Sequence, residues 1–102
     1  MKTLIIGLLA IAWLASSAAA TADAAAGKTK AASCIGCHGM TGISTNPLWP
    51  NLAGQHEAYL VKQMNDFKSG ARKDPNMNAL MMPLSESDMA DIAAFFSSQS
   101  CK

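Results

Sequence analysis

Five consecutive residues, Cys34-Ile35-Gly36-Cys37-His38, combine residue types and spacing that together favour one covalent chemistry. A Cys-x-x-Cys-His run is typical of a c-type haem attachment site. The two thiols can add across the two vinyl groups of a haem, and the adjacent imidazole then lies under the iron, where a neutral ring nitrogen is the usual axial ligand. The sequence therefore predicts one covalently attached haem c, with Cys34 and Cys37 as thioethers and His38 on the iron.

Two other uses of a Cys-x-x-Cys pair compete with haem attachment, a redox dithiol and half of a zinc site. Zinc needs four ligands, and the other His and Cys residues are only His56 and Cys101, at spacings unlike those of structural zinc sites. A thioredoxin-type motif belongs in a βαβ unit, and no alternating strand pattern occurs in this sequence. Haem attachment is therefore the favoured interpretation.

The beginning of the chain has the layout of a secretory signal peptide, with a lysine, a short apolar stretch and then small residues. The apolar stretch is shorter than the roughly 20 residues that a membrane-spanning helix needs. We expect a cleaved signal peptide over 1–20 and one domain over 21–102. Cleavage is expected after Ala20, with Ala22 and Ala24 as alternatives. These features predict export to the periplasm without stable membrane insertion.

The charges do not favour a nucleic-acid partner. Of the eight Lys plus Arg residues only Lys2 lies in the expected signal peptide, so seven remain against seven Asp plus Glu. No basic stripe is present for nucleic acid to bind. A domain of this size buries a small fraction of its surface, so we expect a buried haem to supply apolar volume and the haem-free polypeptide to be largely unfolded.

Apolar periodicity and capping residues predict three main helices, loops and no sheet, an all-α fold. Asp23 is a suitable N-cap for a helix that runs into the Cys-x-x-Cys-His site, and Ser85 with Asp88 opens the last helix as an acidic capping box. Gly70 is expected to end the middle helix. The expected ranges are 23–33, 56–69 and 85–98.

Two segments between these helices are expected to be irregular. The segment 39–54 holds closely spaced Gly and Pro residues, and we expect it to wrap one edge of the porphyrin. The segment 71–83 has weak periodicity, two prolines and three methionines, Met77, Met81 and Met82. A thioether from this cluster is the natural sixth iron ligand, since Met/His ligation is usual in cytochromes c. Composition does not select one of the three.

The chain resembles the class I c-type cytochromes, and specifically one half-unit of the periplasmic di-haem cytochromes that carry two such domains in tandem. The resemblance implies a small class I cytochrome c fold around one haem. The motifs that carry it are Ala26-Gly27-Lys28, Cys34 to Gly39, Pro50-Asn51-Leu52-Ala53-Gly54-Gln55, Tyr59-Leu60, Phe67-Lys68-Ser69-Gly70-Ala71-Arg72, Leu84-Ser85 and Ile92 to Gln99.

The resemblance implies specific iron ligands. In this family the methionine ligand lies seven positions before the Leu that opens the last helix, which is Met77 here; Met81 is the second choice and Met82 the third. Pro50 matches the proline whose carbonyl accepts a hydrogen bond from the proximal His and so fixes the imidazole. Bis-His ligation through His56 is a minor alternative.

The remaining site residues are expected around the haem edge and in the core. Trp49, Tyr59 and Arg72 are candidate partners of the haem propionates, with loop packing or a solvated charge as the alternative. Gly27 is expected to meet Phe95 or Phe96 where the first and last helices cross. The other methionines are expected as core filler: Met40, Met64 and Met89.

Two filled axial positions leave the iron no open site, so the expected function is a soluble electron carrier. The resemblance suggests a quinol-oxidising cytochrome complex as donor and a terminal oxidase or reductase as acceptor. A peroxidase-like or ligand-sensing protein is the alternative if the sixth ligand is labile, and a dedicated subunit of one oxidoreductase is another. The expected docking surface is apolar, with Met40, Ile43, Met81 or Met82.

Cys101 departs from the usual pattern of the family. With Cys34 and Cys37 used for haem, it is an odd thiol near the end of an exported chain, and such a thiol is either free or paired between molecules. A tolerated tail residue is slightly favoured over a Cys101-linked dimer, and non-reducing electrophoresis separates the two.

Overall fold

A computed structural model of the 102-residue chain describes residues 2–5, 7, 9–12 and 21–102. The expected signal peptide falls largely on residues outside this description. In the described part of 2–12 there is no regular secondary structure. None of the helices in the described ranges has both the length and the apolar character needed to cross a bilayer.

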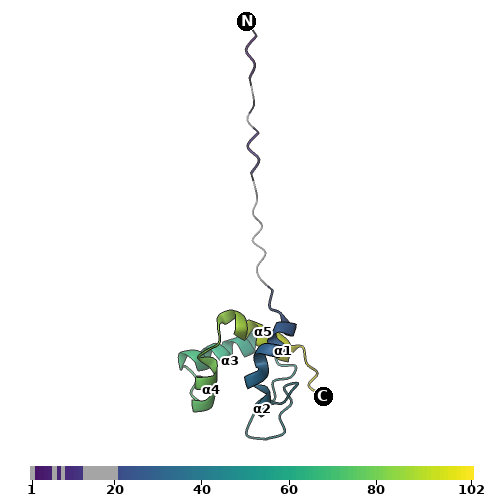
Figure 1. Cartoon of the computed structure of the whole chain (residues 1–102), viewed down its shortest axis with the longest axis vertical. Coiled ribbons are helices and arrows are strands. Elements are labelled where there is room, and N and C mark those ends of the chain that lie inside the picture. The colour runs from purple at the N-terminus through teal and green to yellow at the C-terminus, as the bar shows by residue number, and fades with distance from the viewer. Residues whose placement is uncertain (1, 6, 8, 13–20) are drawn as a thin grey trace.

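The described residues form helices and loops, without strands (Figure 1). The elements are α1 (Ala24–Lys30), the 3-10 helix η1 (Ala31–Ser33), α2 (Ile35–His38), α3 (Glu57–Ser69), α4 (Pro75–Met81) and α5 (Glu86–Ser97). The three expected main helices are present as α1, α3 and α5. The first is shorter than expected, because a 3-10 turn and the short α2 continue the chain after Lys30.

Local capping explains where these helices begin and end. The Asp23 carboxylate accepts hydrogen bonds from the N–H groups of Ala25 and Ala26 at the start of α1. Ser85 and Asp88 form the expected reciprocal capping box at α5. Gly70 ends α3 in the left-handed conformation, with φ of 82°.

The helix α4 corrects the expectation that the segment 71–83 is irregular. Asp74 is its N-cap and accepts hydrogen bonds from the N–H groups of Asn76 and Met77, both at 3.0 Å. Pro75 occupies the first turn, where its missing N–H costs nothing. An Asp-Pro start compensates for weak apolar periodicity. The helix α4 packs against α3 and carries Met77 and Met81.

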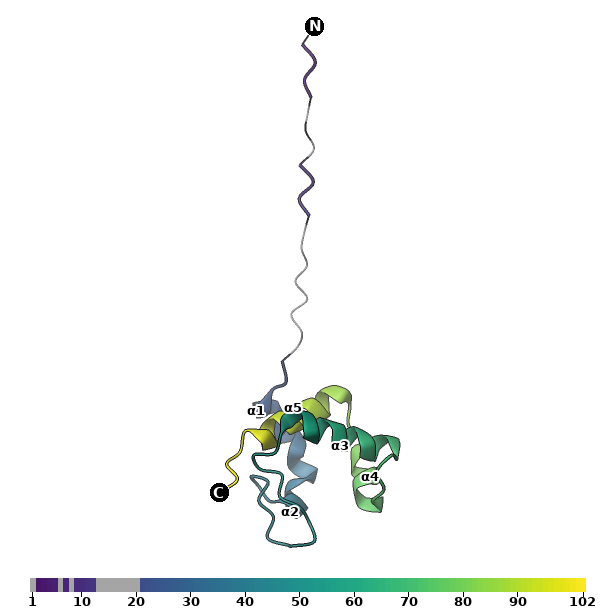
Figure 2. The same ribbon diagram turned by 180° about the vertical axis from the view of Figure 1, so that it is seen from behind.

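The helix α5 packs against both α1 and α3, as the two opposite views in Figures 1 and 2 show. Gly27 lies at the crossing of α1 with α5. A Cβ atom at this position would lie 1.8 Å from the carbonyl oxygen of Asp91, so only glycine permits this approach. Gly27 therefore meets the backbone of α5 at Asp91 and Ile92. The first and last helices cross at Gly27 as expected, with the nearest contact about one turn before Phe95 and Phe96.

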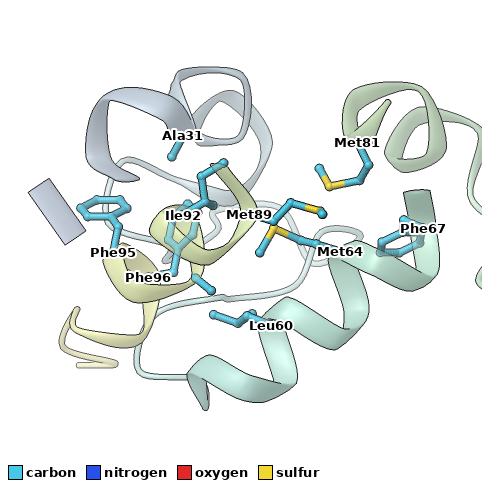
Figure 3. Packing of buried hydrophobic residues seen from close by; sticks show 10 residues of the cluster. Ala31, Leu60, Met64, Phe67, Met81, Met89, Ile92, Phe95 and Phe96 are labelled. Atoms are coloured by element: carbon cyan, nitrogen blue, oxygen red, sulfur yellow. The ribbon is translucent and has the colours of Figure 1, made fainter. Parts of the chain in front are cut away.

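The apolar core lies between α3 and α5, with one methionine from α4 (Figure 3). Its largest fully buried side chains are Phe96, Met81, Met89 and Ile92. Met64 and Met89 are core residues, as expected. Met40 is not, since 77% of it is exposed, and its assignment as core filler is wrong.

A charged cluster holds α1 to α5 on the surface of the core. The Lys30 ammonium lies 2.6 Å from the Asp91 carboxylate and 3.0 Å from that of Asp88. The Asp91 carboxylate also accepts a hydrogen bond from the Asp23 N–H at 2.8 Å. This N–H and then the Lys30 ammonium lower the pKa of Asp91. In turn, Asp91 and Asp88 raise the pKa of Lys30 above its ordinary 10.5.

Candidate haem site

A cavity of about 620 Å³ opens between α2 with its following loop and the pair α3 and α4. This volume lies within the roughly 300–1,000 Å³ that is usual for ligand and cofactor sites. Every residue of the predicted site lines it: Cys34, Cys37, His38, Trp49, Pro50, Tyr59, Arg72, Met77 and Met81. Residues up to 47 positions apart in the chain thus meet around one space. The fold brings together a set of residues that the sequence connected only through spacing and resemblance.

The imidazole of His38 is buried and held in one orientation. His38 is the last residue of α2, and Nδ1 lies 2.9 Å from the carbonyl oxygen of Pro50. Because a carbonyl can only accept, Nδ1–H donates, and Nε2 of the neutral ring keeps its lone pair. Gly39 has φ of 87° directly after the helix and starts the loop that returns Pro50 to the imidazole. This arrangement prepares Nε2 to bind a metal.

The two cysteines of the motif are free thiols at the edge of the cavity. Burial raises the pKa of Cys34, whereas redox-active Cys-x-x-Cys pairs have a lowered thiol pKa. Among the described residues there is no strand to build a βαβ unit, and no three His, Cys, Asp or Glu side chains converge on a common point. The environment of the motif therefore does not match a redox dithiol or a zinc site.

Met77 and Met81 lie one turn apart on α4 and differ in burial. Met81 is 1% exposed and belongs to the apolar core, where Figure 3 shows its side chain beside Met89 and Met64. Met77 is half-buried and packs against this core without being one of its buried members. The thioether of Met81 is thus engaged in core packing, and that of Met77 is the less engaged of the two.

Side chains with hydrogen-bond donors also line the cavity. The Arg72 guanidinium stacks on the Phe67 ring, 4.5 Å from its centroid, and donates a hydrogen bond to the Gln63 side-chain oxygen at 2.8 Å. Trp49 and Tyr59 are both partly exposed and line the same cavity. Donors here can meet the carboxylates of a bound group.

Two of the alternative iron ligands and the odd cysteine do not line the cavity. They are His56, Met82 and Cys101, and each is exposed. The expected docking surface also needs correction. Of its expected residues only Met81 is contradicted, because it is buried in the core. Met40 and Met82 are exposed, and Met40 lines a separate shallow depression between α1 and α5. The exposed apolar side chains that do line the cavity are Leu48, Trp49, Tyr59 and Leu80.

Two residues near the site, Gln63 and Asn78, were not predicted from the sequence. Gln63 lines the cavity one helical turn after Tyr59 and one turn before Phe67, so the i, i+4 spacing of α3 was a usable signal. Asn78 makes three hydrogen bonds to backbone groups up to 11 residues away. No local pattern in the sequence indicates contacts of this kind.

The cavity wall fits a covalently attached haem. It combines two free thiols, an imidazole whose Nε2 lone pair is left available, apolar side chains and a guanidinium suited to carboxylates.

Comparison with known proteins agrees with this fit. Residues 24–100 match the family described as Cytochrome c. A cytochrome c4 of Pseudomonas aeruginosa is 50% identical over 99 residues, which cover 97% of this chain and 49% of that protein. Cytochrome c-554(548) of Halomonas halodenitrificans is 47% identical over 81 residues, 76% of this chain and 96% of that protein. The chain therefore belongs to the cytochrome c family, and its cofactor is haem c.

Solved structures show the same fold. The crystal structure of reduced recombinant cytochrome c4 from Pseudomonas stutzeri superimposes with a TM-score of 0.74 at 46% identity, covering 78% of this chain and 46% of that one. The expected all-α class I cytochrome fold is thereby confirmed. The chain spans about half the length of the cytochromes c4 that it matches.

Proposed function

We propose that this protein is a periplasmic electron carrier whose single haem c is bound by His38 and Met77. Bound haem supplies one-electron cycling between ferrous and ferric iron. The thiols of Cys34 and Cys37 would attach the haem, and Nε2 of His38 and the thioether of Met77 would bind its iron. Trp49, Tyr59 and Arg72 are proposed partners of the haem carboxylates.

The observation that carries the proposal is that His38 and Met77 line one cavity from separate helices. If both residues bound the iron, a substrate would have no direct access to it. Met77 is favoured over Met81 because the Met81 side chain is 1% exposed within the core, and moving its thioether to iron would open a void there.

We further propose that the carrier works in the periplasm between two respiratory complexes. Periplasmic location is supported by the signal-peptide layout of the first 20 residues. The proposed partners are a quinol-oxidising cytochrome complex as donor and a terminal oxidase or reductase as acceptor. We propose that they dock on the exposed apolar side chains at the cavity, Leu48, Trp49, Tyr59 and Leu80.

Absorption spectra of the ferric protein test the ligand assignment. A bound thioether gives a weak long-wavelength band, which we expect in the wild type and in Met81→Ala but not in Met77→Ala. Met81→Ala should instead lower the free energy of unfolding by about 2–5 kcal/mol, as for other Met-to-Ala changes in a core. A band that survives in Met77→Ala and disappears in Met81→Ala contradicts the assignment. A wild type without the band favours the alternative function, a peroxidase-like or ligand-binding haem protein.

A further inference from the structure

Asn78 connects the segment that carries Met77 to the end of α3. Its Nδ2 donates hydrogen bonds to the carbonyl oxygens of Phe67 at 2.7 Å and Arg72 at 2.9 Å. Its Oδ1 accepts a hydrogen bond from the Asp74 N–H at 2.9 Å. The two N–H groups and the oxygen of this one side-chain amide therefore each bond a different backbone group. These backbone groups lie in the last turn of α3, in the loop that follows it and at the N-cap of α4.

These bonds matter because α4 has little stability of its own. It has seven residues, and isolated helices of fewer than roughly 12 residues are marginal in water. Met77 lies in its first turn, directly before Asn78, and its N–H bonds to the Asp74 carboxylate. The position of Met77 relative to α3 therefore depends on contacts that reach outside α4, and Asn78 supplies two of them.

A second contact holds the far end of the same segment. The Lys68 ammonium, also in the last turn of α3, donates to the carbonyl oxygen of Leu84. The segment between α3 and α5 is thus attached to α3 on both sides of α4. Of the two attachments, the one through Asn78 is adjacent to Met77.

We infer that Asn78 is a positioning residue that holds Met77 on the iron and limits its displacement by other ligands. The inference rests on the proposed function, which assigns Met77 as the axial ligand. When Asn78 loses its donors, the first turn of α4 is released from α3. Met77 then spends more time away from the cavity, and a competing ligand finds the iron open more often.

Imidazole titration of the ferric holoprotein tests this role. In Asn78→Ala we expect imidazole to bind about tenfold more tightly than in the wild type, which corresponds to about 1.4 kcal/mol, and the long-wavelength thioether band to weaken. Asn65→Ala is the matched control. Asn65 is also partly buried, but its Nδ2 donates to the Val61 carbonyl within α3, so imidazole affinity should stay at the wild-type value.

A second variant keeps the test decisive if Asn78→Ala does not fold. Asn78→Asp retains the side-chain size and an acceptor for the Asp74 N–H but loses both donations, and it should shift imidazole affinity in the same direction. Imidazole affinity within about twofold of wild type in the folded Asn78 variants overturns the inference, even if their melting temperature falls, since that pattern indicates a structural role alone.

Failure of the proposed function gives a different result. If Met77→Ala keeps the thioether band, the ligand assignment is wrong and the positioning role is overturned with it. If Met77→Ala loses the band while the Asn78 variants bind imidazole like the wild type, only the positioning role is overturned.

Discussion

The Nδ1 atom of His38 lies 2.9 Å from the carbonyl oxygen of Pro50, across the loop that separates them by twelve residues. An N–H donated in this way makes the other ring nitrogen a stronger ligand and favours ferric iron. Pro50→Ala keeps the carbonyl but frees the backbone angle that proline fixes.

We therefore expect the reduction potential to rise in Pro50→Ala by up to about 40 mV. A hydrogen bond contributes about 1 kcal/mol, and 59 mV is a tenfold change for a one-electron couple. A redox titration measures this, with Pro47→Ala as the control from the same loop. An unchanged or lower potential in Pro50→Ala would show that the loop holds the carbonyl without the proline.

Substitution of Gly27 should damage folding rather than haem chemistry. The new Cβ in Gly27→Ala would lie 1.8 Å from the Asp91 carbonyl oxygen, so α1 and α5 must separate. We expect a loss of about 2 kcal/mol or more in thermal unfolding of the holoprotein, since overpacking typically costs roughly 1–3 kcal/mol. Gly36→Ala should be near neutral, because apart from the neighbouring residues and the backbone of its own helix nothing lies within 4 Å of the added Cβ. Equal melting temperatures for the two variants would refute the close crossing.

The cluster around Asp91 predicts how stability depends on pH. The pKa of Asp91 in the folded protein is lowered, first by the Asp23 N–H and then by Lys30. The stabilisation that its charged carboxylate provides is therefore present above pH 3.8 and is lost as the pH falls through the lowered pKa. The charged Lys30 ammonium acts at the other end of the pH scale. The stabilisation that it provides is present below pH 10.5 and is lost as the pH rises through its raised pKa. Between these limits stability from this cluster should be nearly constant.

Asp91→Asn separates this contribution from other titrations. Compared with the wild type, the variant should be less stable at pH 7, and the difference should shrink as the pH falls from about 4 towards 2. Unfolding by denaturant across this range measures both profiles. Asp66→Asn, which removes an exposed pair with Lys62 within α3, should leave the acid profile unchanged. A difference between Asp91→Asn and wild type that is independent of pH would exclude the ion pair as its source.

Electron self-exchange between ferrous and ferric copies tests the proposed docking surface. Because residues 21–102 carry seven positive and seven negative side chains, the rate should change less than about threefold between low and high salt. Leu48→Glu places like charges at the contact, so exchange should slow at low salt and recover at high salt. Met40→Glu adds the same charge outside the cavity as the control. Equal effects of the two substitutions would place the contact elsewhere.

The sequence predicted those parts of the fold that depend on local chemistry. Caps at Asp23, Ser85 and Gly70 have fixed side-chain or backbone signatures, so the helix ends were close to the observed ones. The helix α4 was missed because apolar periodicity was the main criterion, although Asp74-Pro75 is a recognisable helix start.

Contacts between segments that are distant in the sequence were not predicted correctly. The partner of Gly27 was misplaced by about one turn of α5, since the sequence shows that two helices cross but not where their backbones touch. Asn78 was missed for a related reason, because its bonds to Phe67 and Arg72 depend on how α4 folds back on α3. Met81 and Met77 differ in burial, and the burial of a side chain depends on the whole fold, so the sequence did not show this difference.

A redox titration followed by absorption tests the central claim most directly, because it reports haem type, axial ligation and potential together. We predict one reversible one-electron transition of a c-type haem, with the long-wavelength thioether band present in the ferric form and lost in Met77→Ala. A wild-type ferric protein that lacks this band and has a five-coordinate spectrum would contradict the proposed His38 and Met77 ligation and the electron carrier built on it.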